Sequence, residues 1–380
     1  MKSDKPHLPN RVLVLMTEVW GHEGGIQQVN RSLIRFFSNL MSCNQVTVLI
    51  MLDSQDVIDV ALAGQSIPPH IKIYGYSANK THFYLAILKF MLFHRPQLVY
   101  MAHIYLVAWG VLCKLLGIKY FFMAYGIDVW SPLSFLKRLG VRLADSAISI
   151  SEHTKTKACN IEPVFQKLQV CYPGLNINTI IYHQERHQKL IQSFNNRKII
   201  LTVGRIDAGE NYKGHAELLI AVQYLQFRHP DLLLVIVGRG SGLSQLQKQV
   251  VKMGIANLVD FAGFVPDDLL PSYYTLCDIF AMPSRGEGFG LVYLEAMAHR
   301  KPCIGSIFDA AGEIIVDGDT GFLVNPDNVP ELIDRLNRLL DAPELRTQMG
   351  QAGRQRYETL FTEDKFHQRF LNIIYQIIED

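Results

Sequence analysis

Short apolar runs alternate with amphipathic runs along this chain, and this pattern most narrows the folds it can adopt. In the first half, the runs expected to be strands are Val12–Met16, Val46–Met51, Leu98–Ala102, Tyr120–Ala124 and Ala147–Ile150. The runs with helical periodicity are Ile26–Leu40, Tyr84–Phe93, Leu106–Leu116 and Leu133–Leu143. Strands that alternate with helices predict a parallel, doubly wound α/β sheet. Such a sheet binds ligands at the carboxyl ends of its strands.

The second half repeats this scheme. Its expected strands are Ile199–Val203, Leu232–Val237, Val259–Phe261, Ile279–Met282 and Pro302–Ile304. Its expected helices are Glu217–Gln226, Ser244–Met253, Leu291–His299 and Glu331–Leu340. A chain of 380 residues is too long for one ordinary core. We therefore expect two Rossmann-like domains, residues 1–176 and 197–362, and a linker at 177–196 that is rich in Asn, Gln and His.

Composition indicates a globular protein, because 49% of the residues are hydrophobic and 19% are charged. No apolar run reaches the roughly 20 residues that a membrane-spanning helix needs. Val12–Met16 is too short for the core of a signal peptide, so we expect a cytoplasmic protein. The six cysteines have neither CxxC nor Cys/His ligand spacing, which predicts reduced thiols rather than disulfides or a metal site.

Charge is distributed unevenly along the chain. Residues 1–176 contain 17 Lys and Arg against 10 Asp and Glu, whereas residues 177–380 contain 20 against 25. The basic half could favour an anionic acceptor or the surface of an anionic membrane. The same excess spread over a large domain is also ordinary, so both interpretations stay open. We expect no nucleic-acid partner, and the sequence leaves the oligomeric state open.

The stretch Ser284–Glu295 combines two glutamates with three glycines. It lies where a predicted strand turns into a predicted helix, so its unpaired amides and the helix dipole favour an anion such as phosphate. Glu287 and Glu295 would repel that anion, but ionised carboxylates accept hydrogen bonds from sugar hydroxyls. One glutamate on a hexose and the other on a ribose would frame a sugar nucleotide. The alternative is a solvated loop glutamate and a first-turn glutamate favoured by the dipole.

This stretch resembles the E-x7-E motif of retaining glycosyltransferases of family GT4. Val203-Gly-Arg205 with Lys213-Gly214 resembles the basic pair of that family, and Gly24-Gly25-Ile26 resembles its N-terminal glycine loop. Val259–Val265 and Asp317–Val324 also have family counterparts. The resemblance runs from about Val12 to the C-terminus and is dense from Ile199 to Val324.

The resemblance implies a GT-B fold, in which two Rossmann-like domains face each other across a cleft and a C-terminal helix, here 363–380, crosses back to the first domain. It implies transfer of a hexose, with retention, from a nucleotide-diphosphate sugar to a hydroxyl of a glycan, a lipid or a small molecule. The implied catalytic residues are Glu287, Arg205 and Lys213. The implied donor-binding residues are Gly24, Gly25, Gly263, Val265, Gly288, Phe289, Gly290, Leu291 and Glu295.

Three residues of the first half are candidates for the acceptor side. The family commonly has His at the position of Tyr125, so this chain departs from the pattern close to the reacting sugar. Tyrosine keeps a hydroxyl donor but is not a base near neutral pH. Asp128 lies in the same segment, and His103 follows the predicted strand Leu98–Ala102. A histidine satisfied within the core explains His103 equally well.

Two other motifs are interpreted as structural. Asp317-Gly318-Asp319 has the letters of a DxD metal motif, but an Asp-Gly step between apolar runs favours a tight turn. We therefore expect no metal and no cofactor, with Arg205, Lys213 and helix amides stabilising the leaving diphosphate. Gly238-Arg-Gly240-Ser-Gly242 lacks the GxGxxG spacing of a dinucleotide fingerprint, which argues against NAD.

Two alternative functions remain beside this interpretation. A nucleotide-sugar epimerase on the same fold would need a general acid/base pair, and the sequence offers no convincing one. A non-catalytic sugar-nucleotide-binding subunit is conceivable because of Tyr125. Basic-apolar stretches around Lys89 and Lys137 could contact a membrane surface peripherally, although half-buried helices also explain them.

Overall fold

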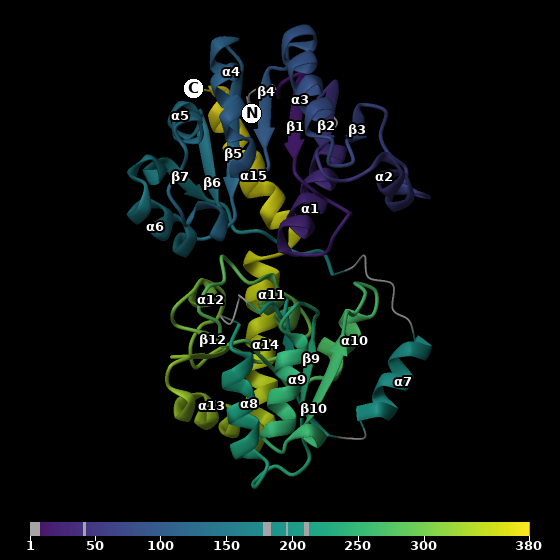
Figure 1. The fold of residues 1–380 in the computed structure, drawn as a ribbon, viewed down its shortest axis with the longest axis vertical. Coiled ribbons are helices and arrows are strands. Elements are labelled where there is room, and N and C mark those ends of the chain that lie inside the picture. Colours follow the sequence, from purple (N-terminus) through teal and green to yellow (C-terminus); the bar gives the residue numbers. More distant parts are fainter. Residues whose placement is uncertain (1–7, 41–42, 178–183, 195–196, 209–212, 380) are drawn as a thin grey trace, which may run out of the picture. The chain divides into compact units, whose positions relative to one another are not determined.

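The computed structural model describes residues 8–40, 43–177, 184–194, 197–208 and 213–379 (Figure 1). The chain divides into two compact units. Residues 1–174 and 363–380 form the first unit, and residues 175–362 form the second.

The first unit is built on a seven-stranded, all-parallel sheet in the order β3-β2-β1-β4-β5-β6-β7. Its strands are β1 Arg11–Met16, β2 Gln45–Ile50, β3 Ile71–Gly75, β4 Leu98–Met101, β5 Lys119–Ala124, β6 Ser146–Ser149 and β7 Leu168–Val170. The strand order reverses between β1 and β4, which are hydrogen-bonded neighbours. At such a reversal the loops after the two strands diverge, and doubly wound folds bind ligands there.

Helices cover both faces of this sheet. They are α1 Gly25–Asn39, α2 Gln55–Leu62, α3 Lys80–Lys89, α4 Gly110–Leu115, α5 Phe135–Leu143, α6 Glu152–Ile161 and α15 Glu363–Glu379. Short helical turns are η1 Phe90–His94, η2 Ile104–Trp109, η3 Ile127–Val129 and η4 Pro163–Lys167. Although α15 ends the chain, it belongs to the first unit and packs against α1 (Figure 1). Phe370 of α15 contacts the rings of Phe36 and Tyr100, and Arg35 forms a 2.6 Å ion pair with Glu363.

The second unit contains a six-stranded parallel sheet in the order β10-β9-β8-β11-β12-β13. Its strands are β8 Lys198–Val203, β9 Leu232–Val237, β10 Val259–Gly263, β11 Ile279–Ala281, β12 Cys303–Ser306 and β13 Gly321–Val324. The helices are α7 Gln184–Phe194, α8 His215–Leu225, α9 Leu243–Lys252, α10 Leu270–Leu276, α11 Leu291–Ala298, α12 Ala311–Ile314, α13 Val329–Asp341 and α14 Pro343–Leu360, with the turn η5 Ala256–Leu258. Here the strand order reverses between β8 and β11. The predicted fold class, two doubly wound parallel α/β sheets, is confirmed.

Several elements differ from the sequence-based expectation. β3, β7 and β13 extend the sheets, and α2, α6, α10 and α14 were not predicted. The helix expected at Leu106–Leu116 begins as the 3₁₀ turn η2. The segment expected to be a linker, 177–196, contains α7, which is grouped with the second unit and places Phe194 against Tyr273 of α10. Residues 178–183 and 195–196 of that segment lie outside the described residues.

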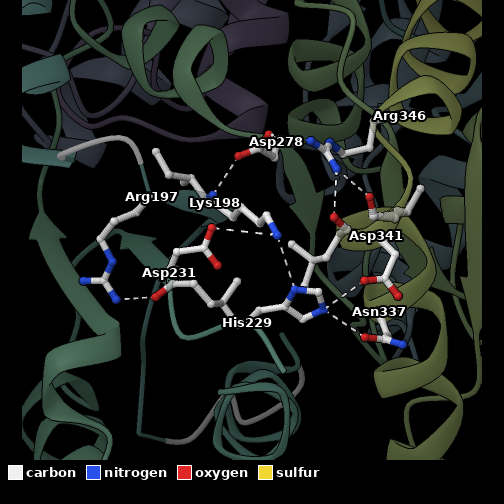
Figure 2. A network of polar contacts seen from close by, with 12 residues as sticks. Arg197, Lys198, His229, Asp231, Asp278, Asn337, Asp341 and Arg346 are labelled. Carbon is white, nitrogen blue, oxygen red and sulfur yellow. Dashed lines mark hydrogen bonds and ion pairs between the residues drawn. The ribbon is translucent and has the colours of Figure 1, made fainter. Parts of the chain in front are cut away.

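A polar network closes the amino-terminal edge of the second sheet (Figure 2). His229, whose side chain is 3% exposed, contacts Asn337 of α13 through Nε2 at 2.9 Å and Lys198 of β8 through Nδ1 at 3.4 Å. Asp278 accepts a 2.8 Å hydrogen bond from the Ile199 amide and pairs with Arg346 of α14 at 3.2 Å. The network joins the amino-terminal ends of strands β8 and β11 to helices α13 and α14. Ligands of doubly wound sheets bind at the carboxyl ends of the strands, so we assign this network a structural role.

In the part of the chain that the structure describes, no helix is long and apolar enough to cross a membrane. All six cysteines have free thiols, and five are buried. Of the basic-apolar stretches, Phe83, Ile87 and Met91 are buried, whereas Phe93 and Phe135 are exposed.

Candidate functional site

The Ser284–Glu295 stretch forms the loop between β11 and α11, as its apolar and glycine pattern predicts. Gly290 ends the loop with φ 97°, a left-handed conformation that favours glycine. A Cβ there would also lie 2.5 Å from the Tyr293 ring. The Tyr293 hydroxyl donates a 2.6 Å hydrogen bond to the carbonyl of Met282. The start of α11 is therefore fixed against the end of β11, and Gly288, Phe289, Gly290 and Leu291 lie at this helix start.

Glu287 forms an ion pair with Lys213, which lies just before α8. The side chains are only 16% and 11% exposed, respectively, so the pair is largely removed from water. A pair in such surroundings is screened less by salt than a surface pair. Two residues 74 positions apart in the sequence thus meet at the carboxyl edge of the sheet.

Two glycines allow this meeting. A Cβ on Gly204, directly after β8, would lie 2.9 Å from Lys213 Cδ, so the lysine stem crosses the strand end closely. Gly214 has φ 79°, and a Cβ there would lie 2.4 Å from the carbonyl oxygen of Pro283. A side chain at Gly214 would collide with the Pro283 backbone, so glycine there lets the start of α8 pack against the segment that precedes Glu287.

Asp309, between β12 and α12, holds the Glu287 loop and was not predicted. It is 6% exposed. One carboxylate oxygen accepts from the Ser284 hydroxyl and, at 3.3 Å, from the Glu287 amide. The other accepts from the Ala311 amide at 2.9 Å. Burial raises the pKa of Asp309 to about 7, with the Glu287 charge adding to the rise and these hydrogen bonds opposing it.

We expect Asp309→Asn to remove a pH dependence of stability. An aspartate whose pKa is raised on folding binds more protons in the native than in the unfolded state, so its contribution falls as pH rises from about 4 to 7. Each tenfold increase in proton affinity on folding, which is a pKa rise of about one unit, changes the free energy of unfolding by roughly 1.4 kcal/mol. The free energy of unfolding of the wild type minus that of the variant, from urea denaturation, should therefore be larger at pH 5 than at pH 8. If the wild type and Asp309→Asn differ in free energy of unfolding by the same amount at pH 5 and pH 8, Asp309 does not cause the pH dependence.

Arg205 lies on the same turn after β8 as Gly204. Its side chain is 63% exposed and lies 3.6 Å from Asp207. The structure therefore brings Glu287 and Lys213 together, whereas the Arg205 side chain, eight positions before Lys213, is largely exposed. Residues 209–212, between this turn and Lys213, lie outside the described residues.

Glu295 lies in α11 and accepts a 2.6 Å hydrogen bond from the Tyr274 hydroxyl of α10. The Tyr274 ring stacks on His299, which directly follows α11. Burial, with the Glu295 charge, raises the pKa of Tyr274, so this hydroxyl stays protonated and donates. Tyr274, which the sequence analysis did not single out, thus orients Glu295.

Gly263 ends β10 and Val265 lies in the loop after it, and backbone contacts hold this segment close to the turns after β9 and β8. The Gly238 amide donates to the Gly263 carbonyl at 2.8 Å, and a Cβ on Gly238 would lie 1.8 Å from the Gly204 carbonyl oxygen. Val265 is buried. The carboxyl ends of β8, β9 and β10 are therefore packed against one another at the same edge of the sheet.

In the first unit, Gly24 and Gly25 start α1 after the loop that follows β1. The buried Glu18 accepts from Gln27 at 2.7 Å, and its carbonyl accepts from Asn30 at 2.8 Å. Asp53 accepts from the amides of residues 19, 20 and 21 at 2.8–3.2 Å. Two carboxylates, neither of which was predicted, thus hold the glycine loop in place.

The three acceptor-side candidates of the first unit lie together. Tyr125 donates through its hydroxyl to Asn30 Oδ1 at 3.1 Å, and its amide donates to Asp128 at 3.0 Å. His103 stacks on Tyr125 with ring centroids 6.2 Å apart. His103 Nδ1 accepts from the Tyr105 amide at 3.1 Å, so the neutral ring carries its proton on Nε2, which lies 3.8 Å from Asp128.

Burial shifts the protonation of this cluster toward neutral forms. It lowers the pKa of His103 to about 4, with the Lys137 charge adding to the effect. It raises the pKa of Asp128 to about 6, against the opposing amide hydrogen bonds. It also raises the pKa of Tyr125. Near neutral pH the cluster thus presents the Nε2 donor of His103 beside the Asp128 carboxylate, while the Tyr125 hydroxyl donates its proton to Asn30.

The motif Asp317–Asp319 forms a turn. Gly318 has φ 79°, and its amide donates to the Gly321 carbonyl at 2.8 Å. Asp317 accepts from the Leu323 amide at 2.9 Å. Among the described residues, no three His, Cys, Asp or Glu side chains converge in a way that could hold a metal ion.

Comparisons with known proteins agree with this architecture. Residues 183–356 match the family model described as glycosyl transferases group 1. The chain is 36% identical over 155 residues to the alpha-D-kanosaminyltransferase of Streptomyces kanamyceticus, covering 41% of this chain and 39% of that protein. It is 29% identical over 238 residues to the GDP-mannose-dependent alpha-(1-6)-phosphatidylinositol monomannoside mannosyltransferase of Mycolicibacterium smegmatis, covering 59% and 61%. The chain thus spans about two-fifths to three-fifths of the length of these relatives.

Solved structures show the same fold. Anabaena Alr3699/HepE in complex with UDP-glucose has a TM-score of 0.76 at 20% identity, covering 96% of this chain and 98% of that one. A glycosyltransferase from Rickettsia africae has a TM-score of 0.79 at 17% identity, covering 98% and 100%. The two parallel-sheet units are those of the GT-B fold. The group 1 match over residues 183–356 falls within the second unit, the unit that contains the Lys213–Glu287 pair.

Proposed function

We propose that this protein transfers a hexose, with retention and without a metal ion, from a nucleotide-diphosphate sugar to a hydroxyl of an acceptor. The observation that carries this proposal is the Lys213–Glu287 pair at the carboxyl edge of the second sheet. A cation suited to phosphate and a carboxylate suited to sugar hydroxyls stand side by side there, next to the start of α11. The group 1 match over the same segment supports the assignment.

In this proposal Lys213 and Arg205 stabilise the departing diphosphate. At an effective dielectric constant of about 20, a cation near 4 Å from a phosphate charge contributes on the order of 4 kcal/mol before desolvation. Lysine acts as a point charge, whereas arginine can donate two parallel hydrogen bonds. Amides at the start of α11 and the carboxylate of Glu287 would bind the hexose. Glu295, oriented by Tyr274, would accept from the ribose.

Retention by this route requires no side-chain base. The acceptor attacks the face from which the diphosphate leaves, and the leaving phosphate oxygen takes the acceptor proton. The first-unit cluster suits this scheme, because His103 is neutral and Tyr125 keeps its hydroxyl proton. We propose that these two groups and Asp128 donate to and accept from the acceptor or the reacting sugar. Tyr125 would replace the donor function of the histidine usual at this position only if its hydroxyl exchanged its hydrogen bond to Asn30 for one to the substrate.

The relatives support the donor class and leave its details open. One is a GDP-mannose-dependent mannosyltransferase and another a kanosaminyltransferase, and a structural neighbour holds UDP-glucose. Their sugars and bases differ, so we propose a nucleotide-diphosphate sugar without assigning either part.

A panel of sugar nucleotides tests the proposal. We expect one of the UDP-, GDP- or ADP-sugars to raise the thermal midpoint by mass action, and to be hydrolysed or transferred in a way that EDTA leaves unchanged. Binding without turnover across an acceptor panel would instead favour a non-catalytic binding subunit. A requirement for a divalent cation would contradict the metal-independent mechanism.

A further inference from the structure

Helix α8 of the second unit is apolar on both of its faces. Its inner face lies in the core and consists of Leu218, Leu219, Ala221, Val222 and Leu225. From His215 to Phe227, a stretch that the structure describes throughout, the exposed residues are Ala216, Ile220, Tyr224 and Phe227, and none of them carries a charge. A helix that is hydrophobic all round is ordinarily covered on all sides. We therefore expect the outward face of α8 to contact another molecule.

These four exposed residues, which we call the α8 face, form one continuous stripe. Ile220, Tyr224 and Phe227 follow one another at spacings of four and three residues, with Phe227 in the turn after α8. Their exposed fractions are 43%, 67% and 86%. The two rings alone leave roughly 300 Å² of surface uncovered, which is large for one patch on a monomer. Aromatic residues without charged neighbours are typical of the centre of a protein interface.

A positive charge flanks the α8 face on one side. Helix α9 lies beside α8, because Gln223 of α8 donates a 2.8 Å hydrogen bond to the carbonyl of Met253, directly after α9 (Figure 1). Lys252, the last residue of α9, is exposed. This side of the α8 face is therefore basic.

Aspartates flank the α8 face on the other side. Helix α13 packs against α8, and Asp341 at its end forms a 2.6 Å ion pair with Arg228, in the turn after α8. Asp334 is exposed and lies on the same side of α13, two helical turns before Asp341. The two arginines of α13 lie over the Phe322 ring of β13 instead. This flank is therefore acidic.

We propose that two copies of this chain associate through the α8 face. A two-fold interface places the same surface on both partners, so an uncharged centre meets its own copy without repulsion. A two-fold axis that runs roughly along α8 would place Lys252 of each copy opposite the aspartate flank of the other, which is electrostatically complementary. A stable interface covers roughly 800 Å² on each partner, so the rings would form its centre and the outer sides of α9 and α13 its rim.

The α8 face lies at the end of α8 that is remote from the candidate donor site. Lys213 precedes the helix, whereas Tyr224 and Phe227 lie at its end, beside His229 of the network at the amino-terminal edge of the sheet (Figure 2). Association through this face therefore leaves the Lys213–Glu287 pair uncovered. The inference goes beyond the proposed function and does not depend on it.

Sedimentation velocity of the full chain over a series of concentrations tests the inference. We expect a species of twice the chain mass that dissociates on dilution. Tyr224→Glu/Phe227→Glu places like charges at the centre of the interface and should raise the Kd of the dimer at least a hundredfold, with circular dichroism verifying the fold. The matched control, Val60→Glu/Leu115→Glu, changes two exposed apolar residues of the first unit and should leave the Kd unchanged.

Reversing the basic flank provides a second variant. Lys252→Glu places like charges opposite each other across the two-fold axis and should weaken the dimer at least tenfold at low ionic strength, and less when salt screens the charges. An unchanged Kd in Lys252→Glu would overturn the two-fold arrangement.

Two results would overturn the association itself: a wild type that stays monomeric at every concentration, or a dimer that Tyr224→Glu/Phe227→Glu leaves intact. A monomeric wild type that binds phosphatidylglycerol vesicles, and loses this binding in Tyr224→Glu/Phe227→Glu, would also overturn it, because the α8 face would then contact a lipid surface. The donor panel is measured separately, so each of these results leaves the proposed function standing.

Discussion

Glu287→Gln is expected to lower kcat/KM for glycosyl transfer at least tenfold while the protein stays folded. Glutamine keeps the shape but loses the charge, so it accepts more weakly from a hexose hydroxyl and no longer pairs with Lys213. Initial rates with the donor identified by the panel measure the loss. Circular dichroism and the thermal midpoint verify the fold.

The matched control is Glu344→Gln, which removes an exposed glutamate from the first turn of α14. It should retain wild-type turnover. Unchanged turnover in Glu287→Gln would remove this residue from the site, whatever its contact with Lys213.

Lys213→Ala should reduce kcat by roughly a hundredfold, because removing one group that stabilises developing charge costs about that much in other enzymes. The substitution also leaves Glu287, whose side chain is 16% exposed, without its cation. A partly buried carboxylate that loses its partner destabilises the fold. Stability and activity therefore need separate measurement, by urea denaturation and by saturation kinetics.

The Lys213→Ala/Glu287→Gln double variant separates these two effects. Because the residues are in contact, their effects on stability should not add, and the double variant should unfold at a higher urea concentration than Lys213→Ala alone. Its turnover should stay low, since the diphosphate still lacks its cation. Recovery of turnover in the double variant would show that Lys213 serves only to neutralise Glu287. Lys248→Ala, an exposed lysine on α9, controls for loss of charge.

The sequence predicted the strands whose two faces are both buried. β1, β8 and β9 are nearly continuous apolar runs, as expected for strands with both faces covered. β3 was missed because exposed and half-buried residues alternate along it, and β7 because it has three residues. α14 has a largely polar sequence, and its packing depends on glycines: a Cβ on Gly350 would lie 2.0 Å from the Arg300 carbonyl oxygen.

In the candidate site, too, the residues of a local sequence pattern were predicted and those brought in by tertiary contacts were not. The spacing of Glu287 and Glu295 on a glycine-rich strand-to-helix turn was visible in the sequence, as was the basic residue Lys213. Asp309 and Tyr274 were not, because they contact the motif across the sheet edge from 22 and 21 residues away and belong to no local pattern. Residues that orient a motif through tertiary contacts have no spacing rule by which they can be found.

A crystal structure of the protein soaked with the sugar nucleotide that the panel identifies tests the central claim most directly. The account predicts the diphosphate within hydrogen-bonding distance of Lys213 and Arg205, a hexose hydroxyl on Glu287 and a ribose hydroxyl on Glu295. A diphosphate bound away from Lys213, or sugar hydroxyls that contact neither glutamate, would contradict it.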